Sequence, residues 1–202
     1  MGKVLFFVIS FFICWFMVSS CSKNGGKTDT KPEMDSDSVV MRTPYFSDMN
    51  ETEVTFSDDG DTLLRFPRNS EMTEYEVPEH VKYIEERAFQ GCKSLQRVTI
   101  PASVNHIEMA AFDECSNLKT VYLYAKIDTL PFRCFNWCEK LESIHLANTL
   151  PPMIEDLEET EEETIQLFFA GVNLEKCKIY VPSGSRQHYK NAYGWRLFKN
   201  LQ

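Results

Sequence analysis

The chain has 202 residues and a formal net charge of −9 at pH 7, with 30 acidic against 21 basic side chains. This charge argues against a nucleic-acid partner, because neutralising a phosphate backbone needs clustered lysine and arginine. The length allows one domain, or at most two, once any targeting segment is set aside.

The first twenty residues have the pattern of an export signal. Lys3 precedes an almost wholly apolar run from Val4 to Val18, which is short for a membrane-spanning helix of roughly twenty residues. The run ends at Val18-Ser19-Ser20-Cys21, which resembles the lipobox of bacterial lipoproteins, with valine in place of the usual leucine and serine in place of glycine or alanine. The resemblance implies a lipoprotein signal peptide at 1–20 and a lipid on Cys21. An uncleaved membrane anchor is the alternative.

Residues 21–50 are rich in Gly, Ser, Thr, Asp and Lys and have few large apolar side chains. Such a segment cannot bury enough surface to offset the entropy lost on ordering, so a flexible lipid-anchored tether is predicted. The anchor implies a location in the cell envelope, at the outer membrane. No acidic cluster of the kind that some lipoproteins use for export to the exterior follows Cys21, so a periplasmic and a surface-exposed domain both stay open.

From residue 51 to residue 202 a single period of 23 residues organises the sequence. Seven apolar columns keep this register, and their first members are Val81, Ile84, Phe89, Cys92, Leu95, Val98 and Ile100. A fixed period in this range is typical of a solenoid, in which each repeat is one coil that buries its apolar side only by stacking on its neighbours. The chain is therefore predicted to form a stack of coils.

Each coil is predicted to contain one short strand and one helical turn. The Leu-x-x-Val-x-Ile pattern at 95–100 ends in alternation with β-branched residues inward, which favours a strand in a parallel sheet. The segment 84–92 spaces its apolar residues by three and four, which favours a helical turn whose phenylalanine fills the core.

The stretch from Ala88 to Pro101 reads AFQGCKSLQRVTIP. It resembles the leucine-rich repeat class, and within it the BspA-like group of bacterial surface proteins, whose coils read AF-x-x-C-x-x-L-x-x-V-x-I-P. The second coil departs from that pattern with Tyr124 in place of the proline, and the third with Cys134 for the alanine and Ala147 for the proline. The resemblance spans about residues 56 to 198 and implies a leucine-rich repeat solenoid of about four stacked coils.

Both ends of the stack are predicted to be capped. Residues 52–66 hold two apolar runs around an Asp-Asp-Gly-Asp turn, which favours a β-hairpin covering the first open end of the sheet. Residues 186–193, ending at Gly194, favour a C-terminal helical cap whose aromatic side chains include Trp195 and Phe198.

An acidic insertion is predicted near 151–164, as a loop grafted onto the fourth coil. Seven carboxylates lie between residues 155 and 163. The segment lacks the glycine and ligand spacing of calcium loops, and whether it binds cations stays open. After it, Phe168 is predicted to continue the phenylalanine column, ten residues late, and Leu174, Cys177 and Ile179 the Leu, Val and Ile columns.

The cysteines are predicted to serve the core. Cys92, Cys115 and Cys138 share one column, where their side chains would point in parallel rather than toward each other as a disulfide requires. Metal binding through Cys134-x-x-x-Cys138 is the alternative, but no second pair has the spacing of a zinc site. No H-E-x-x-H motif, nucleophile with its base or phosphate loop is present. The prediction is a noncatalytic protein without metal or cofactor.

A ligand-binding patch is predicted on the outer face of the sheet. Where Val98 and Ile100 point inward, their neighbours point outward, and the same holds at steps of 23 residues. The predicted patch comprises Arg97, Thr99, Tyr122, Tyr124, His145, Lys176, Lys178 and Tyr180. Aromatic and basic side chains together are typical of recognition surfaces. The alternative is that strands simply favour exposed Tyr and Thr.

The BspA-like resemblance implies a cell-envelope lipoprotein that binds protein on a host or neighbouring cell, in adhesion, through this face. The alternative is an accessory component of an envelope complex, for glycan capture or assembly. An enzyme has the least support, since no catalytic constellation is found.

Overall fold

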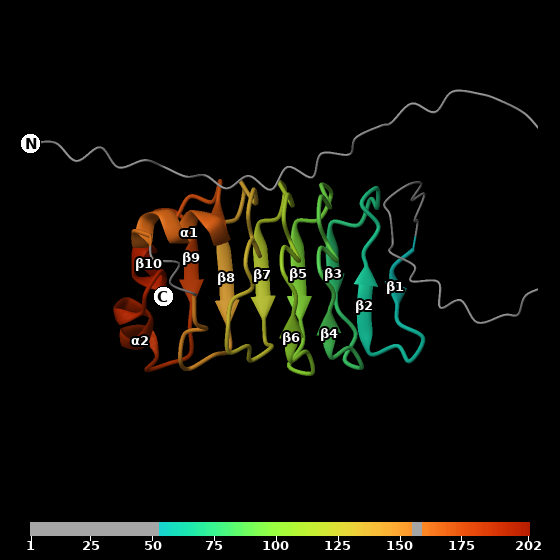
Figure 1. Ribbon diagram of the computed structural model, residues 1–202, viewed down its shortest axis with the longest axis horizontal. Helices are drawn as coiled ribbons and strands as arrows, with labels where there is room; N and C mark the ends of the chain where they lie inside the picture. The colour runs from blue at the N-terminus through green and yellow to red at the C-terminus, as the bar shows by residue number, and fades with distance from the viewer. Residues whose placement is uncertain (1–52, 155–158) are drawn as a thin grey trace, which may run out of the picture. The chain divides into compact units, whose positions relative to one another are not determined.

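The computed structural model describes residues 53–154 and 159–202 (Figure 1). The predicted signal peptide at 1–20, the lipidated Cys21 and the tether at 21–50 lie outside the described residues. Within the described ranges, no helix combines the length and the apolar character needed to cross a membrane.

A parallel sheet of six strands forms one side of the stack. Its strands are β3 (Glu74–Glu76), β5 (Arg97–Ile100), β7 (Thr120–Leu123), β8 (Ser143–Leu146), β9 (Lys178–Tyr180) and β10 (Asn200–Leu201). Every adjacent pair is parallel, in the order β10-β9-β8-β7-β5-β3. Val98, Val121 and Ile144 are partners in register, so the predicted 23-residue step is the step between strands. The predicted strands of the second to fourth coils are confirmed, and we call this sheet the large sheet.

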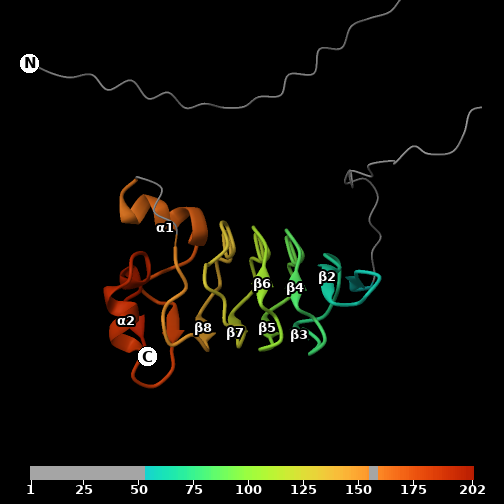
Figure 2. The same ribbon diagram turned by 60° about the horizontal axis from the view of Figure 1, so that its bottom comes forward.

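A second, small sheet lies on another side of the coil (Figure 2). It is built from β1 (Thr55–Phe56), β2 (Thr62–Arg65), β4 (Tyr83–Ile84) and β6 (His106–Ile107). β1 and β2 form the predicted antiparallel hairpin, with Gly60 at φ 77° in the turn, but the hairpin caps the small sheet and the large sheet begins at β3. The sequence pattern did not reveal the small sheet, because strands of two residues are too short to show an alternation.

The small sheet ends at β6, and a proline explains why. The N–H of Glu85 donates to Leu63 and the N–H of Glu108 donates to Ile84. One period later stands Pro131, which has no N–H to donate. In the described chain no backbone hydrogen bond joins β6 to residues 127–131, and Thr129 forms an isolated bridge with Met153 instead.

The segment that carries the buried phenylalanine has turns where a helical turn was predicted. Its backbone forms successive i to i+3 hydrogen bonds, such as the one from Ala88 to Glu85. Left-handed residues recur once per coil, at Arg87, Ala110 and Arg133, with φ between 57° and 58°. A residue with positive φ ends right-handed helical geometry, so the turns do not continue into a helix.

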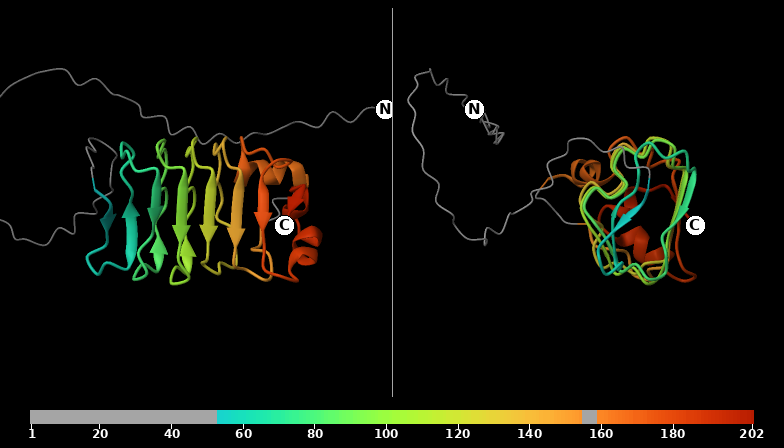
Figure 3. Two further views of the ribbon diagram at one scale, coloured as in Figure 1. Left: turned by 180° about the vertical axis from the view of Figure 1, so that it is seen from behind. Right: turned by 90° about the vertical axis from the view of Figure 1, so that its right-hand side faces the viewer.

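A stack of phenylalanine rings fills the core. Ring centroids are 4.8 Å apart between Phe89 and Phe112 and 5.6 Å apart between Phe112 and Phe135, and these predicted core residues are fully buried. The end-on view in Figure 3 shows the coils superimposed around this interior. The fourth member of the column is Phe169, whose ring lies 5.7 Å from that of Phe135. The prediction of Phe168 was wrong: it is also buried, but its ring packs edge-on against Phe132.

The acidic insertion contains a helix as well as a loop. Helix α1 (Glu161–Phe169) begins after Thr160, which forms a capping box with Glu163. The predicted loop is therefore partly wrong. The extra residues also shift the register of the fourth coil, since Ile179 pairs with Ile144 and thus occupies the Val column rather than the Ile column. Cys177, predicted in the Val column, precedes β9 and is buried.

The C-terminal cap is built as predicted, with one addition. Helix α2 (Arg186–Asn191) is followed by the 3-10 helix η1 (Trp195–Leu197) and then by β10, which was not predicted. Tyr189, Trp195 and Phe198 are buried, and Trp195 Nε1 donates to the carbonyl of Pro152 at 2.7 Å. These contacts cover the exposed end of the core.

The five cysteines in the described ranges are free and buried. Cys115 Sγ lies 3.0 Å from the carbonyl oxygen of Phe89, and Cys138 Sγ lies 3.2 Å from that of Phe112. The thiol column therefore packs as small apolar side chains with a weak donor that joins one coil to the preceding one. This confirms the prediction that these cysteines serve the core.

Candidate binding surface

The outward side of the large sheet, here called the β-face, carries the predicted patch in rows that cross the strands. The first row runs Glu74, Arg97, Thr120, Ser143 and Lys178. The second row runs Glu76, Thr99, Tyr122, His145 and Tyr180. Tyr124 directly follows β7, and Lys176 lies two residues before β9. All eight predicted residues therefore lie on one surface.

Three rings of the second row form a ladder. The ring centroids of Tyr122 and His145 are 4.4 Å apart at 25°, and those of His145 and Tyr180 are 4.3 Å apart at 5°. Both faces of the imidazole are therefore covered by tyrosine rings. Burial lowers the pKa of the His145 imidazole, because taking the charged form out of water is unfavourable.

Charge varies along the β-face from one edge strand toward the other. The carboxylates of Glu74 and Glu76 are exposed on β3, and Lys176 and Lys178 are exposed at β9. Arg97 Nη1 lies 3.0 Å from Glu74 Oε2. The β-face therefore has an acidic edge, a largely neutral aromatic centre and a basic edge.

Sequence reasoning missed four members of the two rows. Thr120 and Ser143 follow Arg97 at steps of 23 residues, so the same alternation could have found them. Glu74 and Glu76 lie on β3, whose half-coil lacks the preceding Leu-x-x-Val signal. They could be placed only once the pairing of β3 with β5 was known.

The β-face is hollowed on both sides of Tyr122. One open hollow of about 550 Å³ is lined by residues of β3, β5 and β7, among them Arg97 and Tyr124. The other, of about 270 Å³, is lined by residues of β7, β8 and the β9 region, among them Lys176 and Lys178. Tyr122 lines both. Open hollows of this kind fit the contours of a macromolecule rather than enclose a small ligand.

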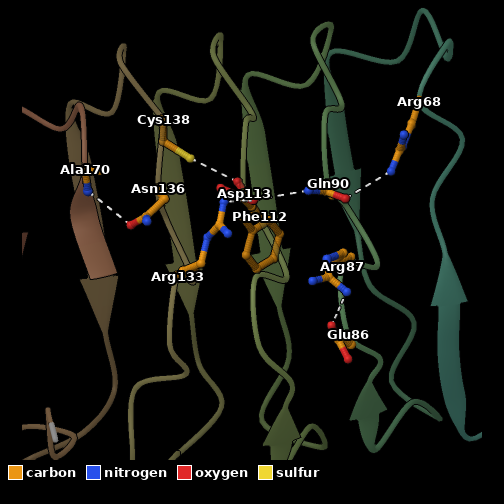
Figure 4. Close-up of polar contacts among 10 residues, drawn as sticks. All are labelled: Arg68, Glu86, Arg87, Gln90, Phe112, Asp113, Arg133, Asn136, Cys138 and Ala170. Atoms are coloured by element: carbon orange, nitrogen blue, oxygen red, sulfur yellow. Dashed lines mark hydrogen bonds and ion pairs between the residues drawn. The ribbon is translucent and has the colours of Figure 1, made fainter. Parts of the chain in front are cut away.

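A second polar cluster lies on the turn side of the coils, where Gln90, Asp113 and Asn136 recur at one residue per coil (Figure 4). Asp113 is fully buried, and its Oδ2 accepts from Gln90 at 3.1 Å and from Arg133 at 2.9 Å. Asn136 Oδ1 accepts from the backbone of Ala170 at 3.1 Å. Burial raises the pKa of the Asp113 carboxyl, and the neighbouring guanidinium of Arg133 opposes that rise. The cluster joins successive coils, and within the described ranges no three His, Cys, Asp or Glu side chains are grouped to hold a metal ion.

Replacing Arg133 by methionine is expected to destabilise the fold by about 1–3 kcal/mol at pH 7, because a buried carboxylate loses its charged partner. The variant's Asp113 has a pKa raised further than in the natural chain. Below that pKa the carboxyl is protonated and needs no cation, so the difference between variant and natural chain is expected to shrink at pH 4.

Urea unfolding at the two pH values measures this difference. Arg68→Met is the matched control, since it removes an exposed contact to Gln90, and it is expected to change stability by less than about 1 kcal/mol at both pH values. An Arg133→Met effect that is equal at pH 4 and pH 7 would contradict the assigned role of the ion pair.

The fold and the β-face together define a class: a leucine-rich repeat solenoid that presents the outer side of a parallel sheet. A family model described as the BspA type leucine rich repeat region (6 copies) matches residues 65–193. The chain belongs to this BspA-type leucine-rich repeat family.

Solved structures are similar to the chain. A leucine-rich cell surface protein from Faecalibacterium prausnitzii is 25% identical with a TM-score of 0.51, and the match covers 76% of this chain and 38% of that protein. The leucine-rich repeat protein of T. pallidum is 21% identical with a TM-score of 0.39, covering 66% and 70% of the two chains. The pneumococcal vaccine antigen PcpA is 19% identical with a TM-score of 0.40, covering 74% and 44%. No curated protein matches the sequence.

Proposed function

We propose that this chain is a noncatalytic protein of the bacterial cell envelope that binds another protein through the β-face, in adhesion to a host or neighbouring cell. The observation that carries the proposal is the continuous exposed surface formed by two rows of polar and aromatic side chains across five parallel strands. Tyrosine and arginine supply rigid contact area and hydrogen bonds together, as at protein interfaces.

The proposed place in the envelope is supported from two sides. The similar protein from F. prausnitzii is described as a cell surface protein. In this chain, the Val18-Ser19-Ser20-Cys21 sequence supports lipidation at Cys21 and hence a membrane anchor. Anchoring at the outer membrane, with residues 21–50 as the tether, would hold the repeat domain away from the lipid.

The ring ladder favours protein over glycan as the ligand. Sugars bind aromatic residues through the open face of a ring, whereas both faces of His145 are covered by Tyr122 and Tyr180 at 4.4 and 4.3 Å. What the ladder presents outward are ring edges and polar groups, which suit hydrogen bonds to polypeptide. The alternative role in glycan capture therefore has less support than protein binding.

The experiment is an adhesion assay with beads that carry the full chain. Tyr122→Ala combined with Tyr124→Ala is expected to reduce bead attachment to target cells at least tenfold, because it removes the centre of the β-face. Tyr83→Ala is the matched control, since Tyr83 on the small sheet is 42% exposed and Tyr124 is 48% exposed. Circular dichroism should be unchanged in all variants. Attachment that survives the double substitution would place the binding site elsewhere.

A further inference from the structure

We infer that the partner of the β-face is the β-face of a second copy of this chain, so that two solenoids join face to face around a two-fold axis. The inference rests on the proposed function and names its partner. Homophilic contact between copies on neighbouring cells would be the resulting form of adhesion. It is carried by the order of residues along the two rows, which is complementary to its own reverse.

The first row shows this self-complementarity in its charges. From β3 to β9 it runs Glu74, Arg97, Thr120, Ser143, Lys178. Set against its own reverse, Glu74 of each copy meets Lys178 of the other, and Arg97 meets Ser143. Thr120 meets its own counterpart at the centre. Two opposite-charge pairs form, and no like charges meet.

The second row behaves in the same way with hydrogen-bonding groups. From β3 to β9 it runs Glu76, Thr99, Tyr122, His145, Tyr180. Set against its reverse, the carboxylate of Glu76 meets the hydroxyl of Tyr180, a strong acceptor opposite a donor. Thr99 meets His145, and Tyr122 meets Tyr122 at the centre. The aromatic ladder thus lies at the middle of the contact, where interfaces concentrate their binding energy.

The position of the axis follows from the charges. An axis parallel to the strands and over β7 places β3 opposite β9 and keeps each row opposite itself. An axis over the boundary between β7 and β8 would instead set Arg97 against Lys178, and an axis across the strands would set Glu74 against Glu74. Both put like charges together, which is unfavourable. Only the first arrangement pairs acids with bases.

The shape of the β-face permits the contact. The strands of the large sheet lie in a nearly straight row (Figures 1 and 3), so its face is close to flat from β3 to β9. Four strand spacings of about 4.8 Å give a span of about 19 Å. Such a narrow face buries less area than a standard interface, so a single contact is expected to be weak. Many copies displayed on one surface would strengthen it through multivalency.

Two-colour bead clustering tests the inference, with beads that carry the full chain and flow cytometry to count mixed clusters. Wild-type beads are expected to cluster with each other. Beads with Glu74→Lys, and beads with Lys178→Glu, are each expected to cluster with themselves at least fivefold less, because like charges then meet at both positions. Mixing the two variants restores both opposite-charge pairs, and mixed clusters are expected to return to near the wild-type level.

The mixing experiment separates the possible failures. Rescue on mixing supports the inference, since misfolded variants could not restore each other. Glu85→Lys, an exposed charge reversal beside β4, is the control and should cluster like wild type. Mixed beads that stay apart would overturn the inference. Wild-type beads that do not cluster, yet attach to target cells in a manner that depends on Tyr122 and Tyr124, would also overturn it and leave the proposed function standing with a different protein as partner.

Discussion

Replacing Phe112 by alanine is expected to lower the free energy of unfolding by about 3–5 kcal/mol. Phe112 is fully buried in the middle of the ring stack, 4.8 Å from Phe89 and 5.6 Å from Phe135. The substitution leaves a cavity between two coils, and each coil depends on its neighbours for burial. Natural domains have only about 5–15 kcal/mol of stability, so the loss is a large share of the total.

Urea unfolding followed by circular dichroism measures this effect. Tyr124→Ala is the control, because Tyr124 is 48% exposed on the β-face and its removal is expected to change stability by about 0.5 kcal/mol or less. The solenoid interpretation predicts a large difference between the two variants. Equal effects would mean that the phenylalanine column does not carry the core.

Replacing Trp195 by alanine is expected to have an effect of similar size, about 3–5 kcal/mol, but with a different distribution along the chain. Trp195 is buried against Phe169, Tyr189 and Phe198. Its removal also leaves the buried carbonyl of Pro152 without the donor that Trp195 Nε1 supplies, which adds a desolvation cost. Because coils stabilise one another mainly as nearest neighbours, the C-terminal end is expected to open first.

Hydrogen exchange resolved along the chain measures this opening. Amides in β9, η1 and β10 are expected to exchange much faster in Trp195→Ala, while those in β5 and β7 change less. Trp137→Ala is the matched control, since Trp137 is 50% exposed. A uniform loss of protection over all strands would show that the stack unfolds as one unit and that the cap has no special role.

The repeat could be found from the sequence because each column serves one purpose in every coil. Phe89, Phe112 and Phe135 fill the same place, and so do Cys92, Cys115 and Cys138. A side chain that must be buried against its counterpart in the next coil has to recur with the period of the coil. For the same reason the outward rows of β5, β7 and β8 could be predicted residue by residue.

The register of the fourth coil could not be found in this way. The extra residues of the insertion are shared between α1 and the turn after it, and the apolar pattern does not show how many each takes up. Phe169 therefore occupies the place predicted for Phe168, and Ile179 the place predicted for Cys177. Two adjacent phenylalanines at 168 and 169 are equivalent as sequence, and only packing against Phe135 chooses between them.

What the sequence by itself determined is the period, and with it the stacking of coils, the parallel strands and the residues inside and outside the large sheet. The tertiary structure decided which strands pair at the edges, where the small sheet stops and which charges share a row with the aromatic ladder. The physical reason is that burial leaves a periodic record in side-chain type. Backbone pairing, such as that of β3 with β5 or the break at Pro131, depends on hydrogen bonds between coils that side-chain type records only weakly.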